Sequence, residues 1–137
     1  MPDIDNLIEE LDWISEQVSK RVWTISVATL AFSFSFIIES IGNENKQAFL
    51  VPAMVIGPIV LVTLSMVFDL AQYLSGYQQN ISMLRRAEKQ DLEEINYDRT
   101  NFWYRLRSAA YQLKIGFCLA GTLWLVFVIS FRMIALI

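Results

Sequence analysis

The sequence has no histidine, and its 137 residues include one cysteine, Cys118. A single cysteine excludes an intramolecular disulfide and a metal site built from cysteines alone. Without histidine there is no His-ligated zinc or haem and no Ser-His-Asp triad. We therefore expect a protein that is not an enzyme and that has no catalytic residue, no metal and no cofactor.

Charged residues are also scarce. They make up 18% of the chain, against roughly 25% in average soluble domains. The net charge of −3 gives no general case for nucleic-acid binding, and no direct nucleic-acid motif or Gly-rich phosphate loop is present. Hydrophobic residues reach 55%, a balance that indicates a small membrane protein.

Three runs contain no charged side chain: Val22–Ile38, Phe49–Phe68 and Ile115–Phe131. A helix crosses the hydrocarbon layer with about 20 mostly apolar residues and a lower limit near 17. The runs predict an all-α membrane protein with three transmembrane helices. The expected order is an amphipathic cytoplasmic helix at 1–21 continuous with a first span at 22–40, a second span at 49–69, a cytoplasmic helical hairpin at 70–113 and a third span at 114–137.

The basic residues set the orientation. Every Lys and Arg except Lys46 and Arg132 falls before the first span or between the second and third spans. Basic residues near the ends of spans stay on the cytoplasmic side. We expect a protein of the bacterial inner membrane, in contact with lipid, with its N-terminus in the cytoplasm and its C-terminus outside.

Apolar residues continue at helical spacing beyond the spans. One stripe precedes the first span, and another follows the second: Ile4, Leu7, Leu11, Ile14, Val18 and Val22, then Leu70, Leu74, Tyr77, Ile81 and Leu84. Spacings of three and four are typical of coiled-coil seams, and the stripes predict a cytoplasmic helical bundle. They could bury one another within one chain or pack across subunits, and a homo-oligomer is the favoured expectation.

Several charges fall at matched depth. Glu39 and Arg132 are both eighteen residues from an inner basic residue, and Asp69 is level with Arg21 and Lys114. One interpretation is structural: ion pairs Glu39–Arg132 and Asp69–Arg21 or Asp69–Lys114 hold the spans together. The other places Glu39 and Asp69 as acidic rings at the two mouths of a pore.

Within the first span, Ser26, Thr29 and Ser33 form a narrow stripe that suits either close helix packing or the lining of a weakly polar pore. Gly57-Pro58 predicts a kink that either packs or hinges a gate. The helical segments on either side of residues 96–98 have unequal lengths, which favours a bend near Ser75-Gly76. The gating candidates are Gly57, Pro58 and Gly76.

The hairpin carries basic residues interleaved with acids. Ion pairing explains most of them, while the remaining charge could bind an anionic ligand, a headgroup or a cytoplasmic regulatory protein. The candidates for that contact are Arg85, Arg86, Arg105 and Arg107.

These patterns favour a small homo-oligomeric channel or membrane-disrupting effector gated through its cytoplasmic helices. The alternative is a non-enzymatic accessory or scaffold subunit of a larger membrane complex.

The layout of a helix through Ile4–Ile38 and an inward extension at Leu70–Ile95, with Leu84-Arg85-Arg86, resembles a known group. It is similar to the small membrane effectors of bacterial anti-phage defence operons, including Hailong-type channel effectors. The resemblance is architectural and carries no functional residue over to this chain. It implies a role in antiviral defence, by membrane depolarisation after a nucleotide or nucleic-acid signal is made or removed.

Overall fold

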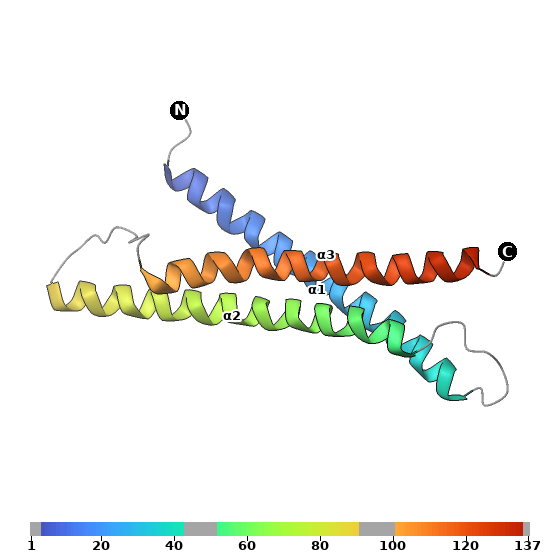
Figure 1. The fold of residues 1–137 in the computed structure, drawn as a ribbon. Coiled ribbons are helices and arrows are strands. Elements are labelled where there is room, and N and C mark those ends of the chain that lie inside the picture. Colours follow the sequence, from blue (N-terminus) through green and yellow to red (C-terminus); the bar gives the residue numbers. More distant parts are fainter. Residues whose placement is uncertain (1–3, 43–51, 91–100, 136–137) are drawn as a thin grey trace.

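The computed structural model describes residues 4–42, 52–90 and 101–135, which form three long helices (Figure 1). They are α1 (Ile4–Gly42), α2 (Pro52–Gln90) and α3 (Phe102–Ile134). At 1.5 Å per residue, α1 and α2 are each about 58 Å long and α3 is about 50 Å. The prediction of an all-helical chain with three apolar helices long enough to cross a membrane is confirmed, and these helices indicate an integral membrane protein.

Two of the helices form a close antiparallel pair, and the third crosses them. Figure 1 shows α2 and α3 side by side over most of their length, while α1 runs obliquely across them and diverges at both ends. The stacked rings of Phe68 and Phe117, with centroids 5.5 Å apart, lie between α2 and α3. The α2–α3 hairpin is therefore the frame on which α1 rests.

Close approach of the hairpin helices depends on Gly121. A Cβ atom at this position would lie 3.2 Å from the backbone oxygen of Pro58 and 3.2 Å from a methyl group of Val62. Pro58 is inside α2 and buried. Proline cannot donate a hydrogen bond to the carbonyl four residues earlier, and its own carbonyl oxygen lies against α3 at Gly121.

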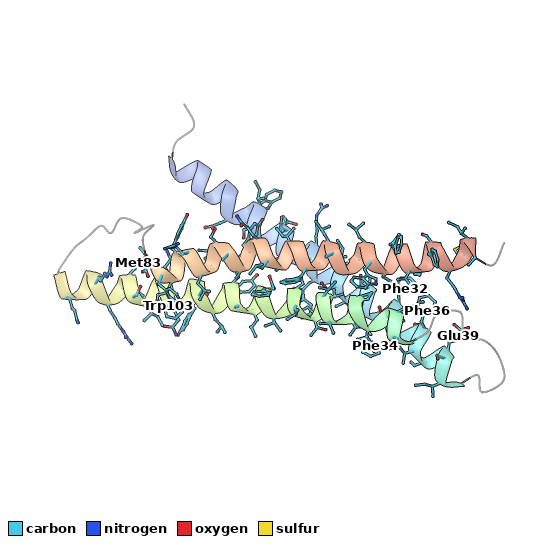
Figure 2. The ribbon with its side chains drawn as sticks, in the orientation of Figure 1. Phe32, Phe34, Phe36, Glu39, Met83 and Trp103 are labelled. Atoms are coloured by element: carbon cyan, nitrogen blue, oxygen red, sulfur yellow. The ribbon has the colours of Figure 1, made fainter. Side chains whose placement is uncertain are left out.

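The ends of the helices follow local chemistry. Asn101 caps α3, since its side-chain oxygen accepts a hydrogen bond from the backbone N–H of Trp103 at 3.2 Å. Pro52 opens α2, where the missing N–H costs nothing because the first turn has no acceptor for it. Figure 2 shows Met83 and Trp103 at one end of the bundle and Glu39 at the other.

The expected bend at Ser75-Gly76 is not needed. α2 stays helical through both residues, and Figure 1 shows its last turns extending past the start of α3. The unequal lengths are taken up by this overhang. The expected connections at Gly42–Gln47 and at residues 96–98 lie, apart from Gly42, outside the described residues, as do Phe49–Val51, Leu92, Ile95 and the last two residues of the third span.

Polar residues fill the interior, and apolar residues cover the outside. Among the described residues, more polar than apolar side chains are buried, whereas large apolar side chains such as Phe32, Val67 and Phe127 are exposed. We call the buried polar set the polar seam; its members are Ser19, Ser26, Thr29 and Ser33 of α1, Ser65, Asp69, Gln72, Ser75 and Gln79 of α2, and Lys114 of α3. An apolar exterior matches a lipid environment, where burying apolar side chains gains little.

Candidate functional site

The centre of the polar seam is an ion pair between Asp69 and Lys114. The Lys114 Nζ atom lies 2.7 Å from Asp69 Oδ1, and the two side chains are 0% and 4% exposed. Removing two charges from water is costly, so a pair buried this deeply is stable only with further hydrogen bonds. Charged residues within membrane-spanning segments mark functional sites more often than surface charges do.

The further hydrogen bonds to the charged groups come from α1, and neighbouring contacts come from α2 and α3. Trp23 of α1 donates its indole N–H to Asp69 Oδ2 at 2.9 Å. The ammonium group of Lys114 also donates to the hydroxyl of Ser19, again from α1, and the Ser65 hydroxyl donates to the Lys114 carbonyl at 2.7 Å. The ammonium nitrogen lies 5.0 Å from the centre of the Tyr111 ring. One charged cluster therefore joins α1, α2 and α3.

Beyond this cluster the seam continues towards the C-terminal end of α1. Ser26 donates to the sulfur of Cys118 at 3.7 Å, and the hydroxyls of Thr29 and Thr122 are 3.2 Å apart. The buried Ser33 hydroxyl has no hydrogen-bond partner. Contact between α1 and α3 along this stretch is thus made by small polar groups and becomes less complete towards Ser33.

The seam also continues in the other direction, along α2. Gln72 donates to the hydroxyl of Ser15 at 3.4 Å, a long contact, and Ser75 bonds to the Ala71 carbonyl of its own helix. The side-chain oxygens of Gln72 and Gln79 are buried without a partner. Unsatisfied buried groups cost free energy, so this part of the seam is under-satisfied.

In the described residues of a single chain the polar seam is closed by packing. Lys114 is fully buried between the helices. The seam is therefore a packed polar contact, and water or ions could follow it only if the helices separated. If the helices separated, polar groups that now pack against one another would be exposed to water, while the apolar exterior would stay in lipid.

The structure places the sequence candidates in different surroundings. Ser26, Thr29 and Ser33 are all buried against the chain's own helices, where packing uses them. Of the two partners weighed for Asp69, the structure pairs it with Lys114, whereas Arg21 is exposed. Glu39 is exposed near the end of α1 (Figure 2), and Arg132 is half-buried in the last turn of α3.

The gating candidates touch the hairpin interface. A Cβ at Gly57 would meet the Trp124 ring at 3.3 Å, and Pro58 follows it in the buried face of α2. Gly76 faces the side chain of Arg107, whose Cδ would be 3.8 Å from such a Cβ.

The basic candidates do not form one cluster. Arg85, Arg86 and Arg105 are exposed. Arg107 is half-buried, and its Nη2 atom lies 3.7 Å from Asp12 Oδ1 of α1. Arg107 is therefore positioned between α1 and α3.

Trp23 was not predicted as a partner for Asp69, and the polar residues of α2 were not predicted to share the buried face of that helix. A signal was present, because Ser65, Asp69, Gln72 and Gln79 repeat at helical spacing within an apolar stretch. The apolar stripe of α2 that was expected to pack in the bundle lies largely on the outside, since Leu70, Leu74, Tyr77 and Leu84 are each more than half exposed.

Comparison of the chain with protein-family models, with curated protein sequences and with solved structures finds no match. The arrangement of side chains is therefore the basis for any statement about function.

Proposed function

We propose that the chain is the subunit of a small homo-oligomeric membrane channel or membrane-disrupting effector, gated through its cytoplasmic helices. The observation that carries the proposal is the polar seam, closed by the Asp69–Lys114 pair inside an apolar exterior. Such a chain has its polar surface buried between its own helices. Because packing closes the seam within a single chain, the conducting form requires several copies and a displaced α1.

The oblique helix α1 is the moving part in this proposal. It is helical from Ile4 to Gly42, so a force on its cytoplasmic turns acts directly on its span. It is hydrogen-bonded to the hairpin through Ser19, Trp23 and Thr29 and packs on it through Phe36. In a rearranged oligomer, the freed stripe of Ser26, Thr29 and Ser33 is the surface that would face the axis.

The proposed setting is the bacterial inner membrane, with the N-terminus in the cytoplasm. The resemblance to anti-phage membrane effectors supports this setting and suggests depolarisation as the outcome. In this proposal a cytoplasmic regulatory protein or an anionic ligand acts on the arms, where Arg85, Arg86, Arg105 and Arg107 supply the positive charge.

An accessory or scaffold subunit is the second candidate. The observation that favours it is the exposed stripe of Leu70, Leu74, Tyr77 and Leu84, which lies in the segment expected to leave the membrane. Apolar side chains that are exposed outside the hydrocarbon layer suit contact with another protein. This alternative predicts a chain that is unstable when it is expressed alone.

The first test is the mass of the purified complex, by native mass spectrometry or by light scattering with detergent subtracted. The proposal expects a discrete oligomer of three to five copies and ion conductance in liposomes made from the pure protein. A monomer without conductance, or a chain recovered only with another protein, would contradict it and favour the accessory role.

A matched set of variants then tests the gate. Lys114→Met leaves the Asp69 carboxylate buried without its partner, and we expect it to raise conductance because an unpaired carboxylate favours the separated, hydrated arrangement of the helices. The double variant Asp69→Leu with Lys114→Met removes both charges and should return conductance to the low wild-type level. Lys89→Gln, which changes an exposed charge in the last turn of α2, is the control. Equal conductance in all four proteins would contradict gating by the ion pair.

A further inference from the structure

The exposed apolar residues in the second half of α2 follow one line along the helix. We call this line the outer stripe; its members are Leu70, Leu74, Tyr77 and Leu84, which are each more than half exposed. At 100° per residue the stripe lies on the opposite side of α2 from the buried Gln72 and Gln79. α1 and α3 of the same chain therefore leave most of it uncovered.

Much of the outer stripe lies beyond the headgroups in the proposed topology. With Asp69 at the inner boundary of the hydrocarbon, Tyr77 is about 12 Å and Leu84 about 22 Å further along α2. The headgroup layer on each side of a bilayer is roughly 5–8 Å thick. An uncovered stripe would expose leucine and tyrosine side chains to water, and apolar patches of this kind mark contact sites.

The first turns of α1 carry apolar residues at the same depth. The hydrogen bonds from Trp23 to Asp69 at 2.9 Å and from Gln72 to Ser15 at 3.4 Å show which residues of the two helices are level. Ile14, next to Ser15, is therefore within one helical turn of the depth of Leu74. Figure 1 shows these turns of α1 leaving the hairpin, and Ile14 is 41% exposed.

The two segments also have opposite charge. From Ile4 to Glu16, α1 has five acidic residues and no basic residue. Two of these acids contact Arg107 and Lys20 of the same chain, at 3.7 Å and 2.7 Å. From Leu70 to Arg86, α2 has no acidic residue and ends on two arginines, of which Arg85 is exposed. Opposite charges beside apolar stripes determine which helices pair.

We infer that the outer stripe of α2 in one copy binds the first turns of α1 from a neighbouring copy. The inference rests on the homo-oligomer of the proposed function and adds the two surfaces that meet. Copies with the same orientation in one membrane hold equivalent residues at equal depth, so the depth match within a chain also holds between neighbours. Each copy gives one α1 segment and receives another, a head-to-tail contact that can close into a ring.

Cross-linking between two single-cysteine proteins tests this contact. Both carry Cys118→Ser, which removes the native thiol and keeps a hydrogen-bonding atom beside Ser26. One also carries Ile14→Cys, the other carries Leu74→Cys, and their C-terminal tags differ in mass. The two proteins are reconstituted together and oxidised. A disulfide-linked heterodimer can then form only between copies.

The matched control replaces Leu74→Cys by Ser108→Cys. Ser108 is exposed on α3 and follows Arg107, which faces Gly76, so the control thiol has a similar depth on a different surface. Because a disulfide requires Cα atoms about 4.4–6.8 Å apart, we expect the Ile14–Leu74 heterodimer at about fivefold the control yield.

Further variants connect the cross-link with the stripe and with charge. Leu84→Ser in the Leu74→Cys protein should lower the yield about threefold, because it removes apolar contact area. Gln78→Ser, at an exposed position outside the stripe, should leave the yield unchanged. Arg85→Glu should lower the yield more than Arg85→Gln, because it places a like charge beside the acidic segment. Circular dichroism on each variant separates lost contact from lost folding.

The outcomes separate this contact from the proposed function. A discrete oligomer whose cross-link yield is no higher than the control would overturn the inference and leave the homo-oligomer intact. An unchanged yield with Arg85→Glu would overturn the acidic segment of α1 as the occupant. A monomeric chain, or a chain recovered only with another protein, would overturn both the inference and the proposed function.

Discussion

The hairpin and the oblique helix are held by different kinds of contact. α2 and α3 approach through Gly121 and stacked phenylalanine rings, along an extended antiparallel interface. α1 crosses them and is attached through hydrogen bonds of Ser19, Trp23 and Thr29, with an apolar contact where Phe36 packs against Val55 and Leu125. In lipid, close packing is the main source of helix association, and single hydrogen bonds add about 0.6 kcal/mol on average. The hairpin is therefore the more extensively packed part of the molecule, and α1 is the more weakly attached part.

The largest effect on this difference is expected from Asp69→Leu. It leaves the Lys114 ammonium buried without a partner and removes the acceptor for Trp23, and we expect a loss of about 3–5 kcal/mol in unfolding free energy. Denaturation in a detergent series, followed by circular dichroism, measures the loss. Adding Lys114→Met should recover most of it, and a double variant as unstable as the single would contradict the assignment.

Gly121→Leu tests the hairpin itself. The new side chain meets the Pro58 backbone, which cannot move aside cheaply, and a loss of about 1–3 kcal/mol is expected. Gly116→Leu is the matched control on the same helix, because a Cβ at Gly116 has nothing within 4 Å. Thermal unfolding of the two proteins should differ clearly; similar unfolding temperatures would show that close approach at Gly121 is dispensable.

A smaller change is expected from Thr29→Val, which removes the hydroxyl pair between α1 and α3. The expected cost is about 0.6 kcal/mol. Amide hydrogen exchange should rise in α1 while protection in α2 and α3 stays unchanged. Ser35→Ala, whose hydroxyl bonds only to the Ala31 carbonyl of its own helix in the described contacts, is the control. Uniform loss of protection across all helices would contradict a separately held α1.

The smallest effect is expected from Asp12→Asn, at the far end of α1. The contact with Arg107 is long and mostly exposed, so removing it should change stability by about 0.5 kcal/mol or less. Unfolding at low and at high salt should show the small difference disappearing as salt rises. A large effect that persists in high salt would place this contact in the more extensively packed part of the molecule.

The spans could be predicted from sequence because lipid imposes a simple condition. Each helix needs a long uncharged run, and Val22–Ile38 and Ile115–Phe131 meet it wherever their neighbours lie. The depth of Asp69 could be predicted for the same reason, and counting residues left Lys114 as one of two partners. The final choice depended on the rotation of each helix, which counting does not give.

The inward face of α2 was harder to predict. One helix carries two stripes with the same spacing, an apolar one through Leu70 and Leu74 and a polar one through Gln72 and Gln79. The spacing shows that both stripes exist, but it does not indicate which stripe contacts the neighbouring helix. The crossing of α1 and the indole hydrogen bond of Trp23 depend on tertiary packing and have no local sequence signal.

The polar interior has a consequence for the temperature dependence of helix release. Separating a soluble bundle exposes apolar surface to water and raises the heat capacity by about 0.45 cal/K/mol per Å², whereas polar surface lowers it by about 0.26 cal/K/mol per Å². When α1 leaves the hairpin, the newly hydrated groups are mainly hydroxyls, amides and a charged pair. The heat capacity change of release should thus be smaller than that of unfolding a water-soluble domain with the same buried area, and the equilibrium should curve less with temperature.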